Sequence, residues 1–237
     1  MPDAVSHAKA YPFPVPGRSY LFRNGEVLDV ASQGFDRAAR TPVLAAGSNQ
    51  SHEQLARKYR VFSGNLEIPV QRGVLLDFDS VYAAHFAGYG SIPSTFYPSP
   101  GTSVTTYILW LDDAQLQRMH ETERNYTFDG LELIQVKIDG TFEQLDRAYI
   151  YSARVGCVNV DGSPVALKEI DAGGRIFPAM SQTQILNYAR ERCAPREDLD
   201  TFIRDLINNE GLRRLCAAEL SNDALPLEFE RTVLAEY

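Results

Sequence analysis

Two features of the sequence have residue types and spacing that suit chemistry, and the first is a small polar loop. Gly47, Ser48 and Asn49 follow a short apolar run and directly precede a segment expected to be helical. Glycine lets the backbone approach a ligand closely, and backbone N–H groups at a helix start attract anions. The loop therefore favours binding of a carboxylate or phosphate. In the alternative, which stays open, Ser48, Asn49 and Ser51 only cap the helix.

The second feature is a carboxylate on the apolar face of an expected helix. Leu116, Met119 and His120 define the apolar stripe of that helix, and Glu123 continues it at helical spacing whereas Glu121 does not. A carboxyl group that faces the core is costly to ionise, and one that takes up a proton near neutral pH can act as a general acid/base. The alternative is that the helix ends a turn earlier and Glu123 faces water.

Capping signals predict where the helices that position these features begin. Ser51 with Gln54 forms a capping-box pattern, after which Leu55, Ala56 and Tyr59 fall on one face. Asp112 or Asp113 can cap the helix that leads to Glu123, and Ser181 with Gln184 repeats the capping box. Further helices are expected at these ranges: 199–207 and 210–220.

The remaining segments are strand-like or contain turn residues. A hairpin around Asn24-Gly25 is expected, residues 1–18 are expected to be irregular, and 97–101 reads as a turn. Apolar or β-branched runs predict strands in these segments: 41–46, 67–97, 103–111, 131–139 and 146–153. Since helices do not alternate regularly with strands, the sequence predicts an α+β fold with a mixed or antiparallel sheet.

Composition excludes several classes of function. The chain has 237 residues and a net charge of −8 with scattered basic residues, which argues against a nucleic-acid or anionic-membrane surface. No stretch has the length of a membrane helix or of a signal peptide. The cysteines and histidines show no metal-ligand spacing, so we expect no metal and a reducing, cytoplasmic setting. These residues are Cys157, Cys193, Cys216, His7, His52, His85 and His120.

Together, these segments resemble the γ-glutamyl cyclotransferase-like superfamily. The stretch "VLAAGSNQSHEQLARK" resembles its strand–loop–helix, whose signature loop reads Tyr-Gly-Ser-Asn. The stretch "GYGSIPSTFYPSPGTSVTTYILWLDDAQLQRMHETE" resembles its next block, which ends in the catalytic glutamate, matched here by Glu123. The stretches "DRAYIYSA" and "TQILNYARERCAPREDLDTFIRDLI" continue the resemblance, which covers residues 42–207.

The resemblance implies a fold, a reaction and a set of site residues. The sheet would be mostly antiparallel and barrel-like, with flanking helices and a helical C-terminal extension. Glu123 would be the general acid/base that cyclises a γ-glutamyl-amine type substrate to 5-oxoproline and releases the amine, without a metal or organic cofactor. The partner would be a small amino-acid-derived molecule, with no nucleic acid and no membrane; a homodimer is left open. The implied substrate-binding residues are Ala45, Ala46, Gly47, Ser48, Asn49 and Gln50.

The chain departs from the family pattern on the substrate side. Ala46 replaces the loop tyrosine. The family's second tyrosine, just before the first C-terminal helix, is also absent from "PAMSQTQ", and the alternatives that would stand in for it are Tyr126, Tyr149 and Tyr151. We read this as altered substrate choice or lost activity. An inactive protein that binds a small carboxylate on the same scaffold is therefore the second hypothesis. The expected organisation is an N-terminal extension, a core domain, and a C-terminal helical extension packed on that domain, over residues 1–40, 41–207 and 208–237.

Overall fold

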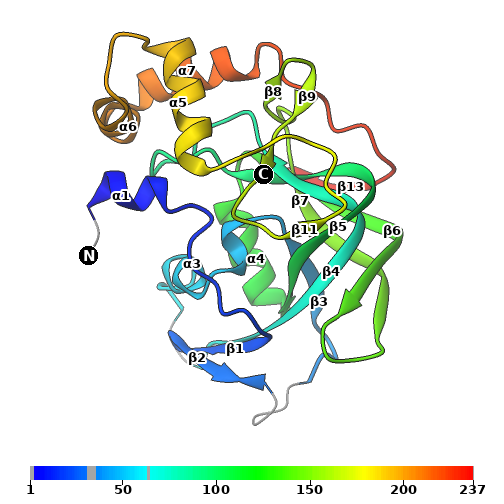
Figure 1. Ribbon diagram of the computed structural model, residues 1–237. Helices are drawn as coiled ribbons and strands as arrows, with labels where there is room; N and C mark the ends of the chain where they lie inside the picture. The colour runs from blue at the N-terminus through cyan, green and yellow to red at the C-terminus, as the bar shows by residue number, and fades with distance from the viewer. Residues whose placement is uncertain (1–2, 31–35, 63–64, 237) are drawn as a thin grey trace.

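At the centre of the computed structural model is a sheet closed on itself (Figure 1). The structure describes residues 3–30, 36–62 and 65–236. The strands of the closed ring are β3 (Thr41–Ala45), β4 (Glu67–Tyr82), β5 (Ser94–Leu111), β6 (Tyr126–Ile138) and β7 (Gln144–Ala153). They pair in the order β5–β3–β7–β6–β4 and back to β5, and only β3–β7 is parallel. The predicted α+β fold with a mostly antiparallel, barrel-like sheet is confirmed by these pairings.

Shorter strands and the helices surround the ring. The short strands are β1 (Tyr20–Arg23), β2 (Glu26–Asp29), β8 (Asn159–Val160), β9 (Ser163–Pro164), β10 (Ala166–Leu167), β11 (Ala172–Gly173), β12 (Ala179–Met180) and β13 (Thr232–Glu236). The helices are α1 (Ala4–Lys9), a 3-10 turn η1 (Ser48–Gln50), α3 (His52–Lys58), α4 (Asp113–Thr122), α5 (Gln182–Cys193), α6 (Leu199–Asn208) and α7 (Glu210–Ser221). In Figure 1, α5, α6 and α7 gather at one end, α1 lies below α6, and α3 lies beside α4.

Capping accounts for several helix starts. Asp112 caps α4 in a full capping box with Gln115, and Ser181 does the same for α5 with Gln184. The sequence-based prediction of these two starts is confirmed. The expected hairpin at Asn24-Gly25 is also confirmed, since β1 and β2 pair across that turn.

The turn predicted at residues 97–101 is wrong, because β5 runs through it. The β4–β5 register jumps there: Phe78 pairs with both Pro98 and Ser103, so the intervening residues bulge out of the ladder. Gly101 has a φ of +83°, and its N–H donates to the Asp77 carboxylate over 2.8 Å. The turn-forming residues thus produce a bulge inside one long strand.

The two chain ends belong to the same core as the ring. Residues 1–18 were expected to be irregular, but Asp3 caps α1, whose Val5 and Ala8 are buried in the main cluster. The C-terminal segment is helical only as far as Ser221, after which β13 pairs with β6. The helical prediction for residues 208–237 is therefore wrong for its last part, since the final residues extend the sheet.

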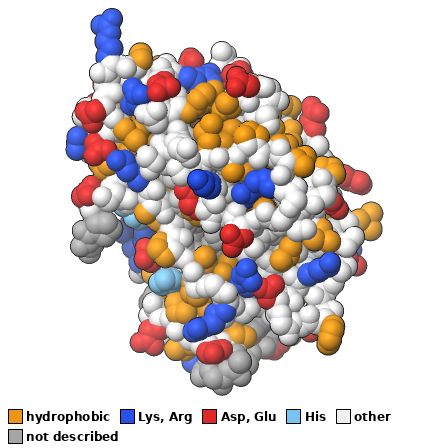
Figure 2. Space-filling model, viewed as in Figure 1, with side chains coloured by type: hydrophobic (Ala, Val, Ile, Leu, Met, Phe, Trp, Pro, Cys, Tyr) orange, Lys and Arg blue, Asp and Glu red, His pale blue; other side chains and the backbone are white. Residues whose placement is uncertain are grey.

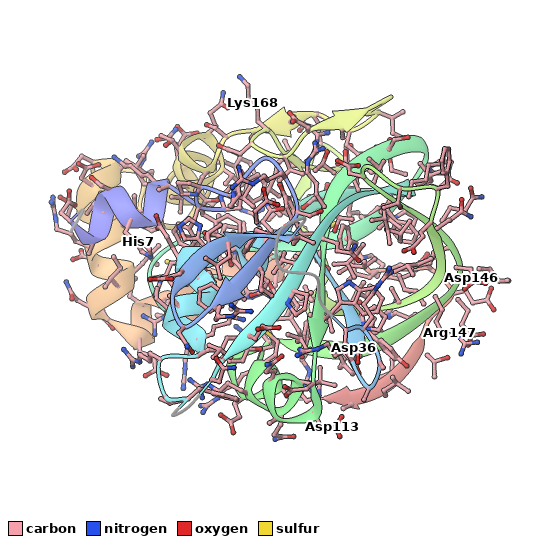
Figure 3. All side chains as sticks on the ribbon, turned by 90° about the horizontal axis from the view of Figure 1, so that it is seen from below. His7, Asp36, Asp113, Asp146, Arg147 and Lys168 are labelled. Atoms are coloured by element: carbon pink, nitrogen blue, oxygen red, sulfur yellow. The ribbon has the colours of Figure 1, made fainter. Side chains whose placement is uncertain are left out.

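The surface carries mixed charge. Figure 2 shows Lys and Arg interspersed with Asp and Glu over the face it presents. In the view of Figure 3, Asp146 and Arg147 lie at the end of the molecule away from His7 and α1. In the part of the chain that the structure describes, no helix combines the length and the apolar character needed to cross a membrane.

Candidate functional site

A cavity of about 450 Å³ lies where the N-terminal arm, the Gly47–Asn49 loop, α3, the end of α4 and the start of β5 meet. We use "arm" for residues 3–18. Its lining includes both features singled out in the sequence, the loop and Glu123. A volume of this size falls within the range of small-molecule sites.

Glu123 lies at the C-terminal end of α4, where it faces the loop. Asn49 Nδ2 donates a hydrogen bond of 2.9 Å to Glu123 Oε1, and Lys58 forms an ion pair with the same oxygen. Glu123 is only 8% exposed, and Met119 and His120 on the same helix are buried. Among the described residues, no hydrogen-bond donor is recorded for Glu123 Oε2. Glu123 Oε1 is therefore held by Asn49 and Lys58, and Glu123 Oε2 is the oxygen that could contact a ligand.

Lys58 was missed by the sequence reasoning. It is the last residue of α3, is 7% exposed, and places Nζ 3.2 Å from the Met119 sulfur. The buried stripe of α3 also contains Leu55 and Tyr59, whereas Ala56, expected on that face, is exposed. If only Leu55 and Tyr59 are taken to define the buried face of α3, the helical spacing predicts that Lys58 also faces inward. Its ammonium group pairs with the Glu123 carboxylate, a contact that the simple burial argument made from sequence did not include.

The loop residues divide into those that reach the cavity and those that do not. The sequence-predicted residues that line it are Ala46, Gly47, Ser48, Asn49 and Glu123. Ala45 and Gln50 are not among the lining residues: the Ala45 carbonyl accepts from Thr106 Oγ1 over 3.1 Å, and the Gln50 carbonyl accepts from the Tyr20 hydroxyl over 2.7 Å. These two residues hold the loop to the sheet.

The capping box predicted at Ser51 and Gln54 is wrong. Ser51 Oγ donates to the Pro14 carbonyl of the arm over 2.8 Å, and no side chain caps α3. Ser48 and Asn49 of the loop lie in the 3-10 turn η1, and α3 begins only at His52. The loop therefore does not run directly into the α-helix, and the proposed ligand site depends on side chains and on close backbone approach.

The arm brings Tyr11 to the loop. The Tyr11 hydroxyl lies 2.8 Å from Ser94 Oγ and accepts from the Ser94 N–H over 2.9 Å. A Cβ placed on Gly47 would lie 2.1 Å from Ser94 Oγ and 2.2 Å from the Tyr11 hydroxyl oxygen. Glycine at position 47 is thus required by space, since no other residue leaves room for these two hydroxyl groups. No pattern in residues 1–18 pointed to Tyr11.

Tyrosine and histidine side chains also line the cavity. Of the tyrosines considered from sequence, Tyr126 and Tyr151 line the cavity, whereas Tyr149 stacks on Phe128 away from it. His85 also lines the cavity; burial lowers its pKa to about 4, and its Nδ1 has no hydrogen-bond partner. His85 is accordingly a neutral imidazole at physiological pH. Within the described ranges, no group of three His, Cys, Asp or Glu side chains could hold a metal ion.

Comparison with known proteins found a distant structural similarity. No protein-family model matches the chain, and no curated protein matches it. Among solved structures, one described as "Gamma-glutamyl cyclotransferase" aligns over 71% of this chain and 98% of that chain, with 14% identity and a TM-score of 0.39. A likeness at this level adds no argument about fold, substrate or reaction.

Proposed function

We propose that this protein is a γ-glutamyl cyclotransferase-like enzyme in which Glu123 is the general acid/base. The observation that carries the proposal is the position of Glu123: a buried carboxylate, anchored through one oxygen by Asn49 and Lys58, that lines a cavity opposite the Gly47–Asn49 loop. The match of this loop and of Glu123 to the family's sequence pattern supplies the reaction.

The reaction is an intramolecular acyl transfer. Glu123 Oε2 accepts a proton from the neutral α-amine of the substrate as the nitrogen of that amine attacks the γ-carbonyl carbon. A C–N bond closes the five-membered ring, the bond to the leaving amine breaks, and Glu123 returns a proton to that amine. The products are 5-oxoproline and the amine, with no water consumed. Because both reacting groups belong to one molecule, holding them in the correct geometry supplies much of the rate.

Lys58 and Asn49 support this assignment by fixing the carboxylate. Lys58 forms an ion pair with Glu123 Oε1, and Asn49 Nδ2 donates to the same oxygen over 2.9 Å. Both donors bind the same oxygen, so the carboxylate is held in one orientation.

The test is turnover by the purified protein on a panel of γ-glutamyl dipeptides and γ-glutamyl amines, with 5-oxoproline measured directly. We expect turnover of at least one compound by the wild type and none by Glu123→Gln. Glu132→Gln is the matched control, because Glu132 is exposed and does not line the cavity. A wild type that releases no 5-oxoproline from any compound would show the proposed reaction to be wrong.

A binding protein without chemistry is the second candidate, and the Lys58–Glu123 ion pair is the observation that favours it. A carboxylate satisfied by its own lysine can be part of a static binding wall. Thermal-shift measurements with glutarate, L-glutamate and 5-oxoproline separate the candidates. Stabilisation that persists in Glu123→Gln, together with no turnover by the wild type, would favour binding alone.

A further inference from the structure

The hydroxyl groups of Tyr11 and Ser94 form a pair inside the cavity wall. They lie 2.8 Å apart, and both residues line the cavity. Tyr11 is 2% exposed and Ser94 is 5% exposed. The backbone of Ser94 is also fixed, because its carbonyl accepts from the Tyr126 hydroxyl over 3.0 Å. The pair is therefore a built part of the site and has little freedom to turn away from it.

The hydrogen bonds of Tyr11 and Ser94 indicate which of the two hydroxyl groups has a hydrogen without an acceptor. The Tyr11 oxygen accepts from the Ser94 N–H over 2.9 Å. Within the described part of the chain, Ser94 Oγ is the one acceptor within hydrogen-bond distance of the Tyr11 hydroxyl, so we assign the phenol as the donor of this pair. Among the described residues, the Ser94 hydroxyl then has no acceptor for its own hydrogen. A buried donor of this kind calls for an acceptor, and the cavity beside it is where a ligand oxygen can lie.

The arm keeps this pair in place. Ala8 and Phe13, on either side of Tyr11, are buried in the main core, and the Ala8 carbonyl accepts from Ser91 Oγ over 2.8 Å. Burial raises the pKa of Tyr11 to about 12, so the phenol remains a neutral donor at physiological pH. Tyr11 is thus suited to orient Ser94 and unsuited to take a proton from the substrate.

We propose that Ser94 donates a hydrogen bond to an oxygen of the bound ligand beside Gly47, and that Tyr11 is the positioning residue that orients the Ser94 hydroxyl. On the proposed function, on which this inference rests, the acceptor is the carboxylate of the γ-glutamyl group. The N-terminal arm is then part of the substrate site, and the donor beside the loop comes from β5 and the arm, at a point where Ala46 contributes only a methyl group.

The test compares two variants with two matched controls. Ser94→Ala removes the donor and Tyr11→Phe removes the group that orients it. Ser99→Ala and Tyr59→Phe are the controls: both residues are buried, each loses one hydrogen bond, with the Thr102 hydroxyl and to the Gln115 carbonyl respectively, and neither lines the cavity. Steady-state kinetics on the best γ-glutamyl compound and circular-dichroism melting are measured for each variant.

We expect Ser94→Ala to raise KM about tenfold or more with kcat changed far less, as for loss of a hydrogen bond to a charged group. Tyr11→Phe should raise KM in the same direction by a smaller factor. The controls should leave KM unchanged even where they lower the melting temperature. If Ser94→Ala and Tyr11→Phe leave KM at the values of their controls, the inference is overturned while the proposed function stands.

A binding measurement separates failure of this inference from failure of the proposed function. If the wild type turns over none of the γ-glutamyl compounds, its stabilisation by glutarate, L-glutamate or 5-oxoproline becomes the readout. Loss of that stabilisation in Ser94→Ala, but not in Ser99→Ala, supports the donor role without the chemistry. Equal stabilisation of the two variants, or no stabilisation of the wild type by any of the three probes, overturns it. Should Ser94→Ala fail to fold, Tyr11→Phe against Tyr59→Phe gives the same decision.

Discussion

Replacing Lys58 by methionine should destabilise the folded protein by about 3–5 kcal/mol, because it leaves the Glu123 carboxylate buried without its cation. The magnitude follows from the burial of both partners: the side chains of Lys58 and Glu123 are 8% and 11% exposed. Asn49 still donates to Glu123, so the loss should fall toward the lower end of that range. The double variant Lys58→Met/Glu123→Gln should recover part of the loss, because no unpaired charge is then buried.

The assay is urea unfolding at pH 7, followed by circular dichroism, for the two single variants and the double variant. Arg214→Met is the matched control, because Arg214 pairs with Glu210 on the surface, where the side chains are 79% and 64% exposed. Surface pairs of this spacing contribute about 0.5 kcal/mol or less. If Lys58→Met costs no more than Arg214→Met, the pair is not buried as described and the reasoning about an anchored carboxylate is refuted.

Two further perturbations test the walls of the cavity. Gly47→Ala should cost about 1–3 kcal/mol through overpacking against Ser94 and Tyr11, whereas Gly88→Ala, which has nothing within 4 Å of its added carbon, should be nearly neutral in urea unfolding. For His85, whose pKa is lowered from 6.5 to about 4, the unfolded chain binds a proton between those values that the folded chain does not. The free energy of unfolding should therefore fall by about 3 kcal/mol as pH drops from about 6.5 to 4. In His85→Gln, the dependence of the unfolding free energy on pH should be weaker over this range. An unchanged slope in that variant would contradict the burial of a neutral imidazole.

The parts of the fold that follow from local chemistry could be predicted from the sequence. The caps at Asp112 and Ser181 and the hairpin at Asn24-Gly25 each depend on neighbouring residues, and each occurs in the structure. The inward direction of Glu123 likewise follows from the helical spacing of Met119 and His120.

The features that depend on contacts between residues distant in sequence could not be predicted. Ser51 has the local pattern of a cap, but the Pro14 carbonyl of the arm takes its hydroxyl instead. Lys58 approaches Glu123 only because α3 and α4 pack together, and Tyr11 reaches the loop only because the arm is buried in the core. Long-range packing therefore supplied two of the side chains that shape the cavity. The spacing of Leu55 and Tyr59 indicates only that Lys58 faces inward, and no residue near Tyr11 in sequence indicates its contact with the loop.

Cyclisation and hydrolysis of a γ-glutamyl amide are separated directly by the isotope content of the product. The measurement is mass spectrometry of the product formed in ¹⁸O-labelled water by the wild type, Glu123→Gln and Glu132→Gln. If Glu123 moves the proton in an intramolecular attack, the wild type and Glu132→Gln yield 5-oxoproline without ¹⁸O, and Glu123→Gln yields none. Glutamate carrying ¹⁸O, or 5-oxoproline formed equally by Glu123→Gln, would contradict the proposed role of Glu123.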